Sequence, residues 1–115
     1  MPDPEPILRH ALLTATLQAE TEVERVEVLR IELVPAQPAG LHRHPCPVVG
    51  WVIAGAIRFQ VADGPMLILQ AGDAFFEPAN VPILHFDNSS DTEPAAFIAC
   101  YLLAPGQDQL IEMLG

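Results

Sequence analysis

The residues best suited to chemistry lie in the stretch GLHRHPCPVVG, at positions 40–50. His42 and His44 are two residues apart, so on a β-strand their side chains face the same side, about 6.5 Å apart along the backbone. Two imidazoles in that arrangement can bind one metal ion. The same spacing also occurs in solvated loops, which Pro45 and Pro47 favour here, so the pair alone leaves both interpretations open.

Two further side chains could supplement the histidines. Cys46 shares the parity of the pair, and its thiolate would favour Zn or Cu, although a small buried hydrophobic residue is the alternative. Glu77, in the run FFEP, has aromatic neighbours, and a carboxylate in an apolar setting needs a partner such as a metal ion or a ligand. On the opposite face of its strand Glu77 would instead be solvated.

The elements that position these residues are predicted to be short β-strands. Twelve prolines and seven glycines are spread along the chain and disfavour long helices. Apolar runs of strand length lie between turn residues roughly every 8–12 positions, as in an all-β sandwich or barrel. The runs are VERVEVLRIELV, VVGWVIAG, AIRFQV, MLILQ, AFFEP, VPILHFDN and AAFIACYLLA.

The run at residues 23–34 has apolar residues on both strand parities. Val26 and Val28 share one parity, whereas Ile31 and Leu33 share the other. A regular strand cannot change face, so either a bulge lies near residue 28 or the two halves of the strand pack differently.

The two ends of the chain give separate predictions. DQLIEMLG, residues 108–115, is the best helix candidate, with Asp108 as its N-cap and apolar residues on one side. The segment PILRHALLTATLQ, residues 6–18, has helix-forming residues but is interpreted as extended.

Composition limits the function classes. A chain of 115 residues forms a single domain, 1–115, and its net charge of −10, without any lysine, argues against nucleic acid or an anionic membrane surface as partner. The N-terminus lacks the basic and apolar regions of a signal peptide, which predicts a cytoplasmic protein. The apolar run at residues 95–105 is too short to span a bilayer as a helix. Two cysteines without a C-x-x-C pair give no disulfide framework.

Two stretches of the chain resemble the signatures of the cupin superfamily. Residues 40–55 resemble the first signature, in which a histidine pair is followed by a glutamate and a glycine; His42, His44 and Gly55 match, but Val48 occupies the glutamate position. Residues 72–88 resemble the second signature, which runs from a glycine through a proline to a histidine and an asparagine. The matching residues of the second stretch are Gly72, Pro78 and Asn88.

The histidine of the second signature is displaced in this chain. Its position holds Ile83, and His85 lies two residues further along, which on a regular strand keeps the same face. The resemblance therefore implies a metal site formed by His42, His44 and His85, with Glu77 or Cys46 as a supplementary ligand.

The resemblance also implies a fold and a cofactor. The expected fold is a small double-sheet, jelly-roll barrel, with the short C-terminal helix predicted above. The expected cofactor is one divalent transition metal, Fe, Zn, Ni, Cu or Mn, at the mouth of the barrel.

Two functions are compatible with such a site. The first is a metal-dependent dioxygenase or related oxidoreductase that acts on a small organic substrate. The alternative is a non-catalytic ligand-binding or sensing cupin with a structural or absent metal, favoured by the missing carboxylate at Val48. An inward carboxylate or amide, from Glu77 or Gln60, would favour catalysis. A homodimer is also predicted, because the extended N-terminal segment offers strands for pairing between chains.

Overall fold

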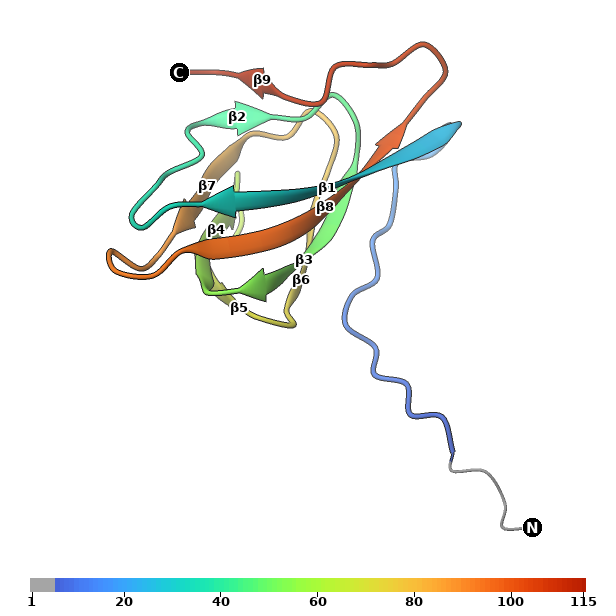
Figure 1. Ribbon diagram of the computed structural model, residues 1–115. Helices are drawn as coiled ribbons and strands as arrows, with labels where there is room; N and C mark the ends of the chain where they lie inside the picture. Colours follow the sequence, from blue (N-terminus) through green and yellow to red (C-terminus); the bar gives the residue numbers. More distant parts are fainter. Residues whose placement is uncertain (1–5) are drawn as a thin grey trace, which may run out of the picture.

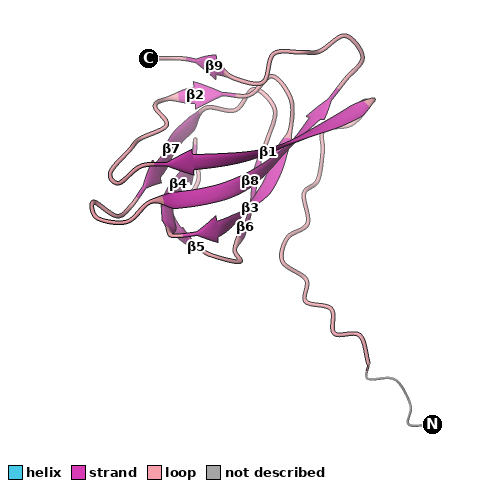
Figure 2. Cartoon of the chain, in the orientation of Figure 1, coloured by secondary structure: helices cyan, strands magenta, loops and turns pink. Residues whose placement is uncertain are grey.

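Strands make up all the regular secondary structure of residues 6–115, the part of the chain that the computed structural model describes (Figures 1 and 2). No helix occurs in these residues. The strands are β1 (Arg25–Leu33), β2 (His42–Arg43), β3 (Val48–Ala54), β4 (Ala56–Val61), β5 (Leu67–Gln70), β6 (Ala74–Glu77), β7 (Ile83–Asn88), β8 (Ala95–Leu103) and β9 (Glu112–Met113).

The strands form two antiparallel sheets that face each other. One sheet has the strand order β1-β8-β3-β6 and the other the order β5-β4-β7-β2-β9. The two layers of Figure 1 correspond to these sheets, with strands β1 and β8 in front of β4 and β7. The predicted all-β architecture of two sheets is confirmed.

Aromatic side chains join the two sheets. Phe75 and Phe97 come from the four-stranded sheet, and Phe59 and Phe86 come from the five-stranded sheet. The ring centroids of Phe86 and Phe97 are 4.6 Å apart, and those of Phe75 and Phe86 are 5.1 Å apart. All four side chains are buried, so this cluster forms the centre of the core and fixes the spacing of the sheets.

Gly55 forms the corner at which the chain passes from one sheet to the other. It lies between β3 and β4, which belong to different sheets, and its φ angle is +76°. A Cβ atom at this position would lie 2.7 Å from the Pro94 carbonyl oxygen. The glycine predicted from the first signature is therefore required both by backbone conformation and by space.

The parity change in residues 23–34 arises without a bulge. β1 pairs with β8 in an unbroken register from Arg25 to Leu33. Leu33 lies in the core and Ile31 packs against it, whereas Val26 and Val28 are more than half exposed on the outer face. The two halves of the strand thus pack differently, and apolar residues lie on both faces of this sheet.

The prediction of a helix at residues 108–115 is wrong. Residues 112 and 113 form β9, which pairs with β2, and the Leu114 amide donates a hydrogen bond to the Leu41 carbonyl oxygen at 2.9 Å. An isolated helix of two turns is marginal because its nucleation is costly. Pairing with β2 satisfies the same backbone groups and outweighs the weak helical preference.

The N-terminal segment, residues 6–18, forms neither a helix nor a strand, so its helix-forming residues do not produce a helix. Figure 1 shows it leading away from the barrel, and it forms no strand with either sheet. Among residues 6–115, no helix has the length and apolar character needed to cross a membrane.

Asn88 ties three segments of the chain together. Its buried side-chain nitrogen donates to the carbonyl oxygens of Leu33, Val34 and Glu93, at 3.3, 3.1 and 2.8 Å. Its side-chain oxygen accepts a hydrogen bond from the Ser90 amide at 3.0 Å. The asparagine of the second signature therefore closes the end of β1 onto the loop between β7 and β8.

Replacement of this asparagine gives a test of the fold. Asn88→Ala should lower the free energy of unfolding by about 2–3 kcal/mol, because buried carbonyl and amide groups lose their partners. Urea denaturation measures the change. Gln109→Ala, which removes one exposed hydrogen bond, is the control and should change stability by less than about 0.5 kcal/mol. Equal effects of the two substitutions would contradict the structural role of Asn88.

Candidate metal centre

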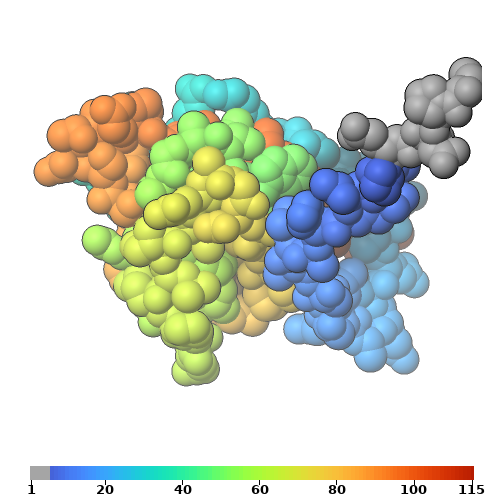
Figure 3. Space-filling view, turned by 90° about the horizontal axis from the view of Figure 1, so that it is seen from below, coloured from blue at the N-terminus to red at the C-terminus, as the bar shows by residue number. Residues whose placement is uncertain are grey.

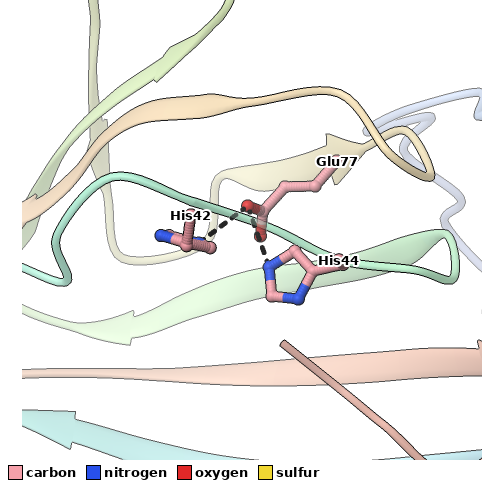
Figure 4. A group of neighbouring side chains, drawn as sticks. All are labelled: His42, His44 and Glu77. Atoms are coloured by element: carbon pink, nitrogen blue, oxygen red, sulfur yellow. Dashed lines mark ion pairs between the residues drawn. The ribbon is translucent and has the colours of Figure 1, made fainter. Parts of the chain in front are cut away.

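Three buried side chains converge between the two sheets. His42 lies on β2, His44 follows that strand, and Glu77 ends β6. One potential ligand atom from each residue lies within 4.8 Å of the others, and all three residues are at most 4% exposed. Figure 4 shows both imidazole rings beside the Glu77 carboxylate. The sequence indicated the histidine pair and offered Glu77 as a supplementary ligand, and the structure brings these three side chains together.

The carboxylate of Glu77 has an unpaired oxygen. Its Oε2 atom is buried and has no hydrogen-bond partner among the described residues. This atom lies 3.3 Å from Nε2 of His44 and 3.8 Å from Nε2 of His42. A buried carboxylate oxygen without a partner is costly, so its position beside two ring nitrogens indicates that a cation belongs between them.

The other ring nitrogen of each histidine faces a backbone carbonyl. Nδ1 of His42 lies 2.6 Å from the Gly40 oxygen, and Nδ1 of His44 lies 2.7 Å from the Leu110 oxygen. A carbonyl can only accept, so each Nδ1 carries the proton and donates it. In the neutral rings Nε2 therefore presents a lone pair to Glu77, and this is the arrangement found in histidines that bind metals.

The charges of the cluster agree with this geometry. Burial alone would raise the pKa of Glu77, but the contacts and charges of the two imidazoles bring that pKa below its ordinary value. Burial alone would lower the pKa of His42, whereas Glu77, the Gly40 carbonyl and the charge of Asp87 raise that pKa above its ordinary value. The carboxylate is therefore an anion that needs a positive charge at the Nε2 atoms, either a proton or a metal ion.

The C-terminal segment holds one of the histidines. Arg43 points away from its two histidine neighbours and forms two hydrogen bonds with Glu112, at 2.9 and 3.2 Å. This ion pair joins β9 to β2, and the residues just before β9 include Leu110, whose carbonyl orients His44. The sequence could not indicate that Leu110 orients His44, because the contact is made by the backbone carbonyl, which every residue type has.

Glu77 lies directly across from the position at which the signature places its glutamate. Val48 and Glu77 are partners in the β3–β6 pair. Directly opposite residues in an antiparallel pair share one face, with Cβ atoms about 4.5–5.5 Å apart. The carboxylate that is missing at Val48 is thus supplied to the same interior region by the neighbouring strand.

The structure does not bring His85 into the cluster. Its side chain is 41% exposed, and its Nδ1 lies 2.8 Å from Oδ2 of Asp87. The register of β7 against β4 shifts between His85 and Ile83, so that Ile83 and Phe86 are the buried residues. The parity argument for His85 assumed a regular strand, and the irregularity removes that assumption. Ile83 instead faces His42 as its pairing partner.

The remaining sequence candidates also lie outside the cluster. Cys46 is a free thiol that is fully buried in the hydrophobic core, and this burial raises its pKa. Gln60 donates its side-chain amide to the Gly64 carbonyl at 3.0 Å, in the turn that follows its strand. The interpretation of Cys46 as a small buried hydrophobic residue agrees with the structure.

A small cavity of about 120 Å³ adjoins the two histidines. Its lining is largely apolar and includes a tyrosine that the sequence indicated only as a buried strand residue. The lining residues are Ile31, Leu33, Ala39, His42, His44, Phe86, Phe97, Tyr101 and Ile111.

Tyr101 is the polar side chain of this cavity apart from the histidines. Its ring packs edge-on against His44, with centroids 5.7 Å apart. Burial, followed by the charges of Glu77 and Cys46, raises the pKa of Tyr101 to about 12. The hydroxyl therefore stays protonated at neutral pH and can donate a hydrogen bond to a molecule in the cavity.

Comparison with known proteins identifies the family. A family model described as the cupin domain matches residues 29–101. This match covers more than half of the chain, which therefore belongs to the cupin family, as the two signatures predicted. No curated protein matches the chain.

Several solved structures share the fold. A structure described under DMSP lyases RdDddP and RnDddQII is 25% identical, with a TM-score of 0.66 over 78% of this chain and 44% of that one. The protein TT1209 from Thermus thermophilus is 26% identical, with a TM-score of 0.61 over 74% and 79% of the two chains. An oxalate oxidase structure is 20% identical, with a TM-score of 0.64 over 77% and 46%. The chain spans less than half the length of the lyase and the oxidase.

Proposed function

We propose that the protein binds one divalent transition metal through His42, His44 and Glu77. The observation that carries this proposal is the orphaned Oε2 atom of Glu77, buried beside two Nε2 atoms. Because both Nδ1 atoms donate to carbonyls, three lone-pair donors meet at one point, and they repel one another unless a cation lies between them.

The donor set favours redox-active iron among the candidate metals. Two imidazoles and one carboxylate, with further positions left for water or substrate, are typical of non-haem Fe(II) oxygenases. Zn, Ni, Cu and Mn also accept these ligands, so the donors alone do not exclude them. With Cys46 in the core, a thiolate ligand that would select Zn or Cu has no support.

We infer that the reaction is an oxidation of a small organic molecule, of the dioxygenase or a related oxidoreductase class. When bound, the metal would supply Lewis acidity and, if iron, a means of using O₂. The chain's own residues hold the ion and orient the substrate: the Tyr101 hydroxyl donates a hydrogen bond, and the apolar wall excludes water. A solved structure that shares this fold is described under DMSP lyases, and this supports an enzymatic role for the site.

A non-catalytic ligand-binding cupin is the second candidate. The observation that favours it is the lining of the cavity, which is apolar apart from two histidines and a tyrosine that stays protonated. Apart from the two histidines, which are the proposed metal ligands, and the protonated Tyr101, the described lining offers no group that could move a proton during catalysis.

Metal content tests the proposed ligands. Protein purified without chelator should contain close to one equivalent of metal, and His42→Ala should lose most of it because one of three ligands is removed. Elemental analysis measures the content. His85→Ala is the matched control and should keep its metal, since His85 lies outside the cluster. Retention of metal by His42→Ala would contradict the site, and loss by His85→Ala would return His85 to the ligand set.

The cross-strand position of the carboxylate gives a second test. Glu77→Val should weaken metal binding by about tenfold or more. The double substitution Glu77→Val with Val48→Glu should recover most of the affinity, because the new carboxylate starts from the directly opposite position on the same face. Titration with Fe(II) and Zn(II), followed calorimetrically, measures both. A correctly folded double variant that binds no better than Glu77→Val would contradict this geometry.

Oxygen consumption tests the proposed reaction class. Iron-loaded protein should consume O₂ with a member of a panel of small diketones, thiols and catechol-like compounds, and Glu77→Gln should abolish this consumption. An oxygen electrode gives the rate, with the zinc-loaded protein as control because Zn is not redox-active. Binding of panel compounds without any O₂ uptake would favour the non-catalytic candidate.

A further inference from the structure

Tyr101 carries a buried hydroxyl that no described protein group binds. The residue is 6% exposed, and its hydroxyl forms no hydrogen bond with the described residues. Among these residues only Oε2 of Glu77 is both fully enclosed by protein and unbonded, so the Tyr101 hydroxyl must border a hollow. That hollow is the cavity of about 120 Å³ beside His42 and His44. A buried polar group at a cavity needs a partner, which a ligand can supply.

Tyr101 and Glu77 lie on the same interior face of the four-stranded sheet. Val48 pairs with Tyr101 on β8 and with Glu77 on β6, so two strand spacings, roughly 10 Å, separate their backbones. His44 lies between them: its Nε2 is 3.3 Å from Glu77, and its ring is edge-on to that of Tyr101. A molecule in the cavity can therefore meet both the histidine side of the proposed metal centre and the Tyr101 hydroxyl.

A larger groove lies elsewhere on the protein. It has a volume of about 230 Å³ and lies between residues 16–22 and barrel residues that include Phe76 and Leu102. Figure 3 shows the N-terminal segment, in blue, beside the body of the barrel on this side. Neither histidine of the cluster lines this groove. The smaller cavity is therefore the one whose ligand would meet the metal centre.

The size and lining of the smaller cavity limit the body of its ligand. Pockets for drug-sized molecules have volumes of roughly 300–1,000 Å³, so about 120 Å³ accepts only a short hydrocarbon body. Ile111 is 43% exposed and forms the rim of the cavity. The apolar side chains of the lining are those of Ile31, Leu33, Ala39, Phe86, Phe97 and Ile111.

No positively charged side chain of the described residues lines this cavity. The chain has five arginines and no lysine, and every arginine falls within residues 6–115. None of the five belongs to the lining. Arg43, between the two histidines in sequence, is bound to Glu112 instead. The metal ion would therefore be the positive charge that a ligand meets.

The charge of the proposed centre favours a ligand with a single negative charge. A divalent ion and the Glu77 carboxylate together keep one net positive charge, because both imidazoles bind as neutral rings. A neutral ligand leaves that charge buried, and a dianion adds a carboxylate without a partner. Asp87, close enough to raise the pKa of His42, adds to the cost of a second anionic group.

We propose that the cavity takes a short aliphatic monoanion, such as a branched monocarboxylate, and rejects dicarboxylates. One oxygen of such a ligand faces the metal centre, the other accepts a hydrogen bond from the Tyr101 hydroxyl, and the hydrocarbon body packs against the apolar lining. The inference rests on the metal site proposed above and narrows its small organic substrate to one class of charge and size.

Three ligands of similar shape test the charge class on zinc-loaded protein, since zinc is not redox-active. Isovalerate has one carboxylate, isovaleramide is its neutral counterpart, and methylsuccinate has a second carboxylate in place of one methyl group. Calorimetric titration should show isovalerate binding most tightly. Methylsuccinate should bind at least about a hundredfold more weakly, because its second carboxylate has no partner. Isovaleramide should bind at least about tenfold more weakly, because it carries no charge.

Substitutions test the residues that select the ligand. Tyr101→Phe should weaken isovalerate binding by about tenfold, because a hydrogen bond to a charged group is lost, and should leave the zinc content unchanged. Ile111→Arg places a cation at the exposed rim and should strengthen methylsuccinate binding by about tenfold or more. Ile68→Arg, on β5 and 51% exposed, makes the same change of charge outside the cavity and should leave both affinities unchanged.

Zinc content and circular dichroism of every sample separate the possible failures. Folded, zinc-loaded protein that binds methylsuccinate or isovaleramide as tightly as isovalerate, or binds none of the three, would overturn the monoanion class and leave the metal site intact. An unchanged isovalerate affinity in Tyr101→Phe would overturn the role of the hydroxyl. Folded protein that takes up no zinc would contradict the metal site itself, and the charge argument with it.

Discussion

The buried carboxylate of Glu77 is the constraint on which the interior of this barrel depends. A carboxylate removed from water must find a positive charge. Beside Glu77 lie instead the Nε2 atoms of two imidazoles whose Nδ1 atoms donate to backbone carbonyl groups. Three parts of the chain meet around this group: β2, the residues before β9 and the end of β6. The arrangement is costly for a purely structural core and reasonable for a site that accepts a cation.

The two sheets contribute differently to the site. The five-stranded sheet supplies His42 and its pairing partner Ile83, while the four-stranded sheet supplies Glu77 and Tyr101. The aromatic cluster between the sheets therefore sets the distance between the imidazole and the carboxylate. The geometry of the site therefore depends on packing in the core, because a shift of one sheet against the other would separate the ligands.

Local patterns predicted the strands, the histidine pair and the family, because each depends on residues close together in the sequence. The aromatic neighbours of Glu77 suggested a buried carboxylate, but its place opposite Val48 depends on the register of β3 against β6, which has no local signal. The failed helix at residues 108–115 has the same origin, since pairing with β2 decided its conformation. The expectation for His85 depended on strand regularity, and a register shift is not visible in residue types.

The hydrogen bond from His44 to the Leu110 carbonyl also sets an order in time. During translation His42, His44 and Glu77 emerge from the ribosome well before residue 110, so the ring of His44 at first lacks the acceptor that fixes its tautomer. The nascent chain thus exposes the ligands before it can orient them. Acquisition of an ion in its final geometry therefore requires the segment around Leu110 to be in place first.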